Sequence, residues 1–589
     1  MRKAAGFLAL FLLAALLWGC SPEAVIPAWE CRVVLEESPG FICADHTQIV
    51  RRGADATFYL ETADGYRILG TDYENATVSP APTGGTIVTL HQIRYPTVVT
   101  LTVEKSDVFL RYHPNDGTNR EALEIPLTPS HLRWNTATGI FTRPGHTLTG
   151  WNTAPDGSGT AVGLGSRLDP AEGPDLYAQW CPWSDESLFR WEKTPTGIRI
   201  TGYAGTEDTV CVPGELEGTP VTCIAADAFR GLVCRRVVLP DSLKIIEDLA
   251  FRDAVMEELV LFDNIRQIRN PGMTLTTLRL NAAELPVYSA TYYDTFQDKY
   301  DWLLSVKDKK KIVLFSGSST RFGYDSKLLR EAFPEYEIVN MGVFAYTTAM
   351  PQMELILQCM NPGDVLLHMP EFDAAKRQFC TTTDLDEPFF NMMESNYDTL
   401  AALDMRHYTN VFPALEAYLS TRDAMDKKSY GLWAGDFDED GNPVGSPSYN
   451  QYGDYIVYRP NAATDQPVYG LPVHYTVSAF PEALFIDPIN RMYEKFQVAG
   501  VYVYYTYSPR NALALSDDST PQARAELDAY FREKLQVPII SELEDSLWRG
   551  VYLYGTDNHL STEGVQIHTQ RLIPLLRAQM EQDGLLEKE

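Results

Sequence analysis

The sequence predicts a multidomain chain in which N-terminal all-β modules and a short leucine-rich solenoid precede an α/β/α domain with a parallel sheet. Three patterns lead to this prediction. Polar and apolar residues alternate from about residue 22 to residue 106, a motif recurs with a 22-residue period further on, and apolar β-branched runs alternate with helical patterns after residue 311. These patterns are typical of antiparallel strands, of a solenoid and of β-α units, respectively.

Length and charge limit the classes of function. The chain has 589 residues with 45% hydrophobic content, which is enough for several folded domains. Its 49 Lys and Arg residues stand against 79 Asp and Glu residues, so the formal net charge is −30. Nucleic acid is therefore not an expected partner, because its phosphates require basic surfaces. Solubility in an exposed setting explains the acidity.

Residues 1–20 have the pattern of an export signal. Two basic residues precede an apolar run from Gly6 to Trp18, which is too short to span a bilayer comfortably. The run ends in the letters LLWGC, which resemble a bacterial lipobox. The resemblance implies cleavage before Cys20 and lipidation of that cysteine. We therefore expect an extracytoplasmic protein that is anchored to the bacterial cell membrane or surface.

The other cysteines leave their pairing open. Eight remain of the nine once Cys20 is set aside, and none lies in a C-x-x-C spacing typical of metal sites. In an oxidising compartment Cys31 and Cys43 are the best disulfide candidates, because they close a short loop. In an anaerobic source the thiols would stay free.

Residues 21–107 predict a β-sandwich-like module. Segments such as ATFYLETADGY and TVVTLTVEK alternate polar and apolar residues, and Gly and Pro turns separate them. No residue pattern in this module suggests chemistry.

Residues 108–180 contain the segments RYHPNDGT, FTRPGHTLTGWNTAPDGSGT and DLYAQW. These closely resemble the internalin-type B repeat, also called the Listeria–Bacteroides repeat, which is a small β-grasp-like module of bacterial surface proteins. We expect Trp151 and Trp180 to be apolar anchors of a small core. Stacking on sugars is the alternative for these two rings.

Residues 181–275 contain the internal repeat. Ala228-Phe229-Arg230 recurs as Ala250-Phe251-Arg252, and this period is one turn of a leucine-rich solenoid. The segments TGYAGTEDTVCVP and GTPVTCIAADAF resemble the BspA-like leucine-rich repeat of bacterial surface antigens. So few coils need a neighbour to pack on, which favours a spacer or docking platform over a large binding surface. The side chains expected to point inward are Val237, Leu239, Ile245 and Ile246.

Residues 276–310 predict a linker followed by an amphipathic helix. Its apolar stripe should pack on the sheet that starts at Ile312, whereas the lysines near its end should be a solvated helix terminus. The stripe consists of Tyr293, Phe296, Tyr300, Leu303 and Leu304, and the lysines are Lys307, Lys309, Lys310 and Lys311.

Residues 311–589 contain the chemically suggestive motifs. The apolar run KIVLF stops at Gly317-Ser318-Ser319. A buried strand that ends in this way and turns into a helix presents a serine hydroxyl beside backbone N–H groups, as nucleophile sites require. His559, in GTDNHLSTEG, is the downstream histidine positioned to serve such a serine. A serine that merely caps a helix is the structural alternative.

The order of these motifs resembles that of SGNH/GDSL-type hydrolases. Ser319 and His559 match the first and last sequence blocks of that family, and the segment from Val339 to Val343 matches a second block through Gly342. The resemblance implies a flavodoxin-like α/β/α fold, Ser319 as nucleophile, His559 as base and Asp557 as its acidic partner. It also implies an oxyanion hole made by the N–H groups of Ser319 and Gly342, and no cofactor.

Two positions depart from the family pattern. Glu371 ends a strand where the family has an oxyanion-binding Asn, and Thr556 stands where the family has the Asp that precedes the histidine. A carboxylate repels a developing oxyanion unless it is protonated or turned away, so Glu371 is a candidate site modulator. The spacing of Asp557 and His559 resembles that of the SGNH-like alginate O-acetyltransferase proteins.

Residues 381–472 predict a long insertion that contains a calcium-loop-like segment. Asp436, Asp438 and Asp440 alternate before a Gly, as in the first half of such a loop, but Pro447 stands where a bidentate Glu is usual. A hairpin turn explains the same letters. No other metal site is expected.

The predicted function is that of an extracytoplasmic SGNH-type serine esterase or O-acyltransferase. It would act on acyl groups, with O-acetyl groups of a surface or host glycan as the expected substrate. The alternative is a non-catalytic surface adhesin or glycan-binding lipoprotein with a degenerate SGNH fold.

Overall fold

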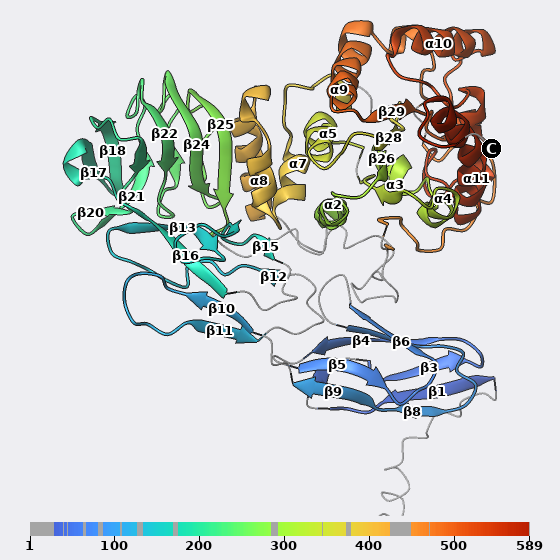
Figure 1. The fold of residues 1–589 in the computed structure, drawn as a ribbon, viewed down its shortest axis with the longest axis horizontal. Helices are drawn as coiled ribbons and strands as arrows, with labels where there is room; N and C mark the ends of the chain where they lie inside the picture. The colour runs from blue at the N-terminus through green and yellow to red at the C-terminus, as the bar shows by residue number, and fades with distance from the viewer. Residues whose placement is uncertain are drawn as a thin grey trace, which may run out of the picture. The chain divides into compact units, whose positions relative to one another are not determined.

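The computed structural model describes residues 29–38, 40–43, 45–62, 66–80, 86–105, 109–126, 134–168, 175–283, 292–343, 345–372, 378–424, 449–450, 452–469 and 472–587. Cys20 and the calcium candidates Asp436, Asp438 and Asp440 lie outside these residues. The chain divides into two compact units, Met1–Phe109 with Pro126–Leu132, and Leu110–Ile125 with Arg133–Glu589. A multidomain, strand-rich chain with several sheets, some of them parallel, is confirmed (Figure 1).

The first unit is built mainly from antiparallel strands. Alternate residues such as Val33, Phe58 and Val88 are fully buried in one apolar cluster, as the alternating sequence predicts. Cys31 and Cys43 both pack in this cluster and are free thiols. The strands are β1 (Glu30–Leu35), β2 (Phe41–Ile42), β3 (Thr47–Arg51), β4 (Ala56–Thr62), β5 (Tyr66–Thr71), β6 (Ala76–Pro80), β7 (Thr86–Leu90), β8 (Thr97–Val99) and β9 (Leu101–Lys105).

The next strands form a five-stranded sheet in the order β11-β10-β16-β13-β14, beside a separate β12–β15 pair. The Trp151 ring is buried, contacts Tyr112 edge to face at 4.7 Å and donates its N–H to the Ala137 carbonyl, so its expected core position is confirmed. Trp180 is half-buried and donates to the Pro114 carbonyl. The strands are β10 (Phe109–His113), β11 (Leu123–Pro126), β12 (Trp134–Asn135), β13 (His146–Asn152), β14 (Ala161–Val162), β15 (Arg167–Leu168) and β16 (Asp175–Pro182).

The repeat region, residues 183–283, stacks equivalent segments in parallel register. Phe229 lies over Phe251 with ring centroids 4.8 Å apart, so the recurring sequence motif is also a spatial repeat. Val237, Leu239 and Ile246 are buried as expected, whereas Ile245 is only half-buried. One sheet contains β17 (Phe189–Thr194), β18 (Gly197–Tyr203), β20 (Glu215–Leu216), β21 (Thr219–Ile224) and β23 (Ile245–Ile246), and the other contains β19 (Thr209–Cys211), β22 (Val233–Val238), β24 (Ala254–Phe262) and β25 (Met273–Asn281).

The predicted amphipathic helix is α2 (Thr295–Ser305). Phe296, Tyr300 and Leu303 are buried, whereas Leu304, at the edge of the expected stripe, is 42% exposed. The expectation of a solvated lysine run is wrong for Lys311. This residue begins a strand, is fully buried and pairs with the buried Asp364 at 2.6 Å.

The C-terminal part, residues 292–587, is organised around a parallel sheet. The four strands follow the order β27-β26-β28-β29, and their bounds are β26 (Lys311–Phe315), β27 (Glu337–Asn340), β28 (Val365–His368) and β29 (Tyr502–Tyr505). Successive residues of β26 enter two different apolar clusters: Val313 packs with one, and Ile312 packs with the other. Both faces of the sheet are therefore covered, as parallel sheets require.

Helices supply the two covering layers (Figure 1). One face packs against side chains of α2, α5 and α9, and the other packs against α4 and α11. The helices of this part are α3 (Ser318–Arg321), α4 (Ser326–Ala332), α5 (Met350–Leu357), α7 (Glu387–Met393), α8 (Val411–Ala424), α9 (Asp487–Val498), α10 (Pro521–Lys534) and α11 (Thr562–Gln582). None of the helices in the described ranges is long and apolar enough to cross a membrane.

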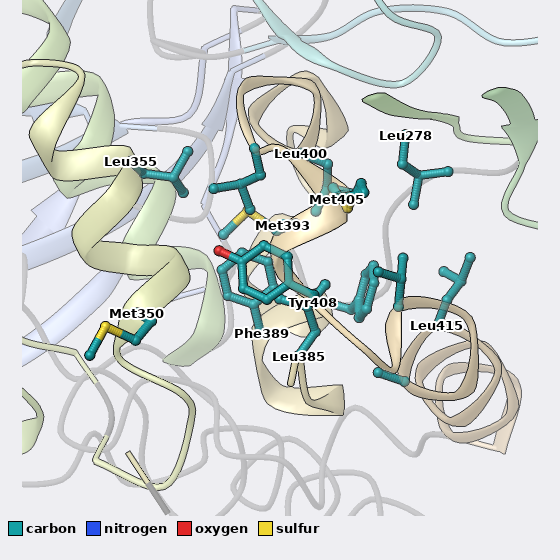
Figure 2. Close-up of a cluster of buried hydrophobic side chains, with 14 of the residues drawn as sticks. Leu278, Met350, Leu355, Leu385, Phe389, Met393, Leu400, Met405, Tyr408 and Leu415 are labelled. Atoms are coloured by element: carbon teal, nitrogen blue, oxygen red, sulfur yellow. The ribbon is translucent and has the colours of Figure 1, made fainter. Parts of the chain in front are cut away.

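Residues 381–424 of the predicted insertion form α7 and α8 with short helical turns between them, and these elements pack beside the repeat region (Figure 1). Figure 2 shows this apolar cluster, in which Leu278 of β25 lies near Met405, which precedes α8, and Leu415 of α8. A buried ion pair at 2.6 Å joins Arg422 of α8 to Asp263, the residue after β24, and adds a polar contact between the insertion and the repeat region. The repeat region and the C-terminal part therefore share one core.

Candidate functional site

A serine and a histidine meet at the carboxyl edge of the parallel sheet. The chain leaves β26 at Phe315, Gly317 caps helix α3, and Ser318 is the first residue of that helix. The Ser318 hydroxyl oxygen lies 2.7 Å from Nε2 of His559. His559 comes from the turn before α11, and its backbone N–H donates to the Thr556 hydroxyl at 2.9 Å. A hydroxyl and an imidazole in this contact can act as nucleophile and base.

The structure does not bring the hydroxyl of Ser319 to His559. Ser319 is fully buried, and its hydroxyl accepts a hydrogen bond from the side-chain amide of Asn558 at 2.8 Å. Neighbouring side chains of a helix point about 100° apart, so only one of the two serines can face the imidazole. In this geometry the half-buried Ser318 is that residue.

Glu371 lies inside the site. Its buried carboxylate accepts the backbone N–H of Ser319 at 2.5 Å and the amide of Asn558 at 2.8 Å. The Ser318 hydroxyl lies 3.3 Å from the same carboxylate, which is farther than its 2.7 Å distance to His559. Glu371 therefore occupies the donor that the sequence analysis assigned to the oxyanion hole.

The backbone of Gly342 is also engaged within the protein. Its N–H donates to Oδ1 of Asn340 at 3.0 Å, and its carbonyl accepts from Lys299. A Cβ on Gly342 would clash with the backbone nitrogen of Arg321. The glycine thus permits close packing of the loop after β27 against α3, and the structure does not present its N–H to the Ser318 hydroxyl.

Asp557 is not a partner of the imidazole. Its carboxylate accepts the backbone N–H groups of Val468 at 2.9 Å and of Tyr469 at 3.0 Å, and the side chain of Asn511 at 3.3 Å. Across the residues that the structure describes, no carboxylate contacts the His559 ring. Asp557 instead ties two neighbouring segments to the turn that carries His559.

The surroundings of His559 keep its imidazole neutral. Burial, followed by the positive charges of Arg321, Arg459 and Arg510, lowers the pKa of His559 to about 3. The Phe322 ring packs on the imidazole at 4.4 Å. A neutral imidazole whose Nε2 lacks a proton can accept one from Ser318, so the site is in the base form near neutral pH.

Sequence reasoning missed Ser318 and Asn558 as site residues. Asn558 bridges the Ser319 hydroxyl and Glu371 through one amide group. It is the middle residue of the Asp-x-His motif, so its place in the sequence was a usable signal. Ser318 precedes the expected nucleophile directly, and only the orientation of α3 distinguishes the two hydroxyls.

A cavity of about 590 Å³ is lined by sequence neighbours of two site residues. Its wall includes Phe372, the residue after Glu371, and Asp557, two residues before His559. Arg510, Tyr346 and Tyr469 contribute further parts of the wall. Its volume is typical of small-molecule sites, which occupy about 300–1,000 Å³.

The described residues contain no group of three His, Cys, Asp or Glu side chains that could hold a metal ion. The comparisons with known proteins add little. No protein-family model matches the chain, and no curated protein is similar to it. Among solved structures, a leucine-rich repeat protein of T. pallidum is 22% identical over 17% of this chain and 71% of its own, with a TM-score of 0.10. At that TM-score the likeness carries no inference about fold or function.

Proposed function

We propose that the C-terminal part is an SGNH-type serine esterase or O-acyltransferase domain in which Ser318 is the nucleophile and His559 the general base. The observation that carries this proposal is the 2.7 Å contact between the Ser318 hydroxyl and Nε2 of His559. The contact lies beyond the carboxyl ends of parallel strands, where ligands of such sheets bind. The order of strand, serine, sheet, histidine and final helix supports the SGNH resemblance.

The chemistry follows from this pair. Oγ of Ser318 attacks the ester carbonyl carbon while its proton passes to Nε2 of His559, and the carbonyl oxygen becomes an oxyanion. Collapse of this intermediate breaks the ester bond, and the leaving alcohol takes the proton from His559. Water or a sugar hydroxyl then attacks the acyl-Ser318 ester and loses its proton to His559. The bond between the acyl carbon and Oγ of Ser318 breaks, Oγ takes the proton back from His559, and the acyl group leaves as an acid or as a new ester.

Two donors can stabilise the oxyanion. They are the backbone N–H of Ser319 and the side-chain amide of Asn558, which supplies the amide that the family pattern places at position 371. Both donate to Glu371 in this structure, so turnover requires Glu371 to turn away or to be protonated. Glu371 is thus the modulator of the site.

The substrate and location extend the same proposal. An acylated glycan, most simply an O-acetylated one, suits a chain whose N-terminal residues resemble a lipoprotein signal with Cys20 as the lipid-bearing residue. The segments that resemble the internalin-type B repeat and a leucine-rich solenoid would then hold the domain at the cell surface.

Hydrolysis of 4-nitrophenyl acetate by the full chain tests the assignment of the serine. Ser318→Ala should abolish turnover, whereas Ser319→Ala, its matched control one residue away, should retain part of it. A fluorophosphonate probe should label the parent and not Ser318→Ala. Equal rates of hydrolysis in the parent and in Ser318→Ala would refute the proposal. If only Ser319→Ala loses hydrolysis, the nucleophile is Ser319.

A second candidate function is a non-catalytic adhesin or glycan-binding surface protein. Glu371 favours it, because a carboxylate on both oxyanion donors opposes turnover. The absence of a carboxylate on His559 within the described ranges points the same way. If neither the parent nor Glu371→Gln reacts with the fluorophosphonate, this second function is the better one.

A further inference from the structure

The cavity whose wall includes Phe372 and Asp557 combines exposed aromatic rings with hydrogen-bonding groups. Tyr346 is 50% exposed and Tyr469 is 56% exposed, and both line it. Exposed tyrosines present a flat apolar face with a polar tip, which suits a ligand that has both C–H faces and hydroxyls. The buried guanidinium of Arg510 and the carboxylate of Asp518 also line the cavity.

Hydrogen bonds within the protein hold this wall in place. Both carboxylate oxygens of Asp557 accept hydrogen bonds from the backbone of the segment that carries Tyr469. One accepts the N–H of Val468, and the other accepts the N–H of Tyr469. The Asn511 backbone N–H, next to Arg510, donates to the Asp557 carbonyl at 2.7 Å. Asp557 therefore fixes Tyr469, Arg510 and the turn of His559 relative to one another, which makes the cavity pre-formed.

Hydrogen bonds also hold the part of the wall that contains His474 and Asp518. Nδ1 of His474 lies 2.9 Å from the carboxylate of Asp518, and the Tyr475 N–H donates to the Ser519 hydroxyl at 2.7 Å. Hydrogen bonds from Ser516 and His474 lower the pKa of Asp518, so this carboxylate is an ionised acceptor near neutral pH. A pair of hydroxyls on a ligand could donate to it.

The charges in the wall select a neutral ligand. The wall contains one guanidinium, that of Arg510, and two carboxylates, those of Asp518 and Asp557, on a chain with a net charge of −30. An anionic ligand would meet repulsion from most of this surface. A purely apolar ligand would cover the ionised carboxylate of Asp518 without donating a hydrogen bond to it, which is costly.

We propose that the cavity is a subsite for a neutral pyranose unit, with its C–H face on Tyr469 or Tyr346 and its hydroxyls on Arg510 and Asp518. The subsite deepens the proposed function and rests on it in one respect: it would place an acyl-bearing hydroxyl of the same or an adjacent sugar next to Ser318. Binding of the sugar itself does not require turnover. Asp557 is a positioning residue of this subsite.

Calorimetric titration of the full chain tests the inference. The probes are xylotetraose, cellotetraose and chitotetraose, with tetragalacturonate as an acidic counterpart. At least one neutral tetrasaccharide should bind the parent and the Ser318→Ala variant equally, and tetragalacturonate should bind more weakly than that sugar. Tyr469→Ala should weaken this binding by about tenfold. Tyr95→Ala, at a tyrosine of the other unit that is 69% exposed, is the matched control and should change nothing.

Three results would overturn the subsite. These are no binding of any neutral tetrasaccharide at millimolar concentration, tightest binding of tetragalacturonate, or unchanged affinity in Tyr469→Ala and Tyr346→Ala. If one variant is unfolded by circular dichroism, the other decides. Hydrolysis of 4-nitrophenyl acetate separates the two proposals. Turnover without sugar binding would refute only the proposed subsite. Sugar binding without turnover that depends on Ser318 would refute only the proposed esterase activity.

Discussion

The carboxylate of Glu371 accepts the backbone N–H of Ser319 at 2.5 Å, at the start of the helix whose first residue is Ser318. The donor that should receive a developing oxyanion is therefore already bound to an internal acid. In the proposed reaction, stabilisation of the oxyanion therefore depends on the charge and position of that one side chain.

Glu371→Gln should raise kcat/KM for 4-nitrophenyl acetate. The neutral amide no longer repels the oxyanion, and one oxyanion donor is worth about 10²–10³ in kcat, so a gain of about tenfold is expected if the donor is partly released. Glu394→Gln, at another buried glutamate outside the site, is the control. A rate unchanged or lowered by Glu371→Gln would show that the carboxylate does not oppose the reaction.

The hydrolysis rate should not depend on protonation of His559 in the ordinary histidine range. Burial and three arginines hold its pKa near 3, so the base is unprotonated at any pH well above that value. We expect no change in kcat/KM from titration of His559 between about pH 5 and pH 8. His559→Ala should lose about 10²–10⁴ of the rate. A midpoint near pH 6.5 in the pH profile would contradict this environment.

Stability should fall on acidification from neutral pH. Burial lowers the pKa of His368 from its ordinary value of 6.5 to about 3. The unfolded state therefore binds more protons between these values, and stability rises with pH across that window. The slope for one such histidine is about 1.4 kcal/mol per pH unit where the unfolded state is protonated and the folded state is not. His368→Gln should flatten the pH dependence of the free energy of unfolding, measured by urea denaturation, and His474→Gln, an exposed histidine, should not.

The buried pair of Lys311 and Asp364 should be sensitive to removal of one partner. Asp364→Asn leaves the ammonium of Lys311 without a counter-charge in the sheet, which costs about 3–5 kcal/mol of unfolding free energy. Glu217→Gln breaks the exposed pair with Lys193 and should cost about 0–1 kcal/mol. Similar losses in the two variants would argue against a desolvated ion pair at β26.

Gly342→Ala should damage both stability and activity. Its Cβ would clash with the backbone nitrogen of Arg321 and push on α3, which carries Ser318. Overpacking of this kind costs about 1–3 kcal/mol, measurable as a lower melting temperature. Gly70→Ala, where no atom lies within 4 Å of an added Cβ, is the matched control.

Local patterns predicted the elements of this chain better than the contacts of its site. The buried strand β26 follows from its apolar run, and the stacked phenylalanines of the repeat follow from their 22-residue spacing. The position of His559 near a serine follows from motif order. The orientation of the site does not, because a one-residue step along α3 exchanges Ser319 for Ser318. The partners of Asp557 are the backbone N–H groups of Val468 and Tyr469. These residues are distant in sequence, and because their backbone groups make the contact, no side-chain motif indicates it.

The packing interface between the repeat region and helices α7 and α8 limits where the chain can be truncated. Leu278 and Asp263 on one side meet Leu415 and Arg422 on the other, deep in a common interior. A truncation that removes the repeats would expose this apolar surface to solvent. It would also leave the guanidinium of Arg422 without the carboxylate of Asp263. We expect such fragments to aggregate on expression. Crystallisation and assays of the C-terminal part should therefore use a chain that retains the repeats.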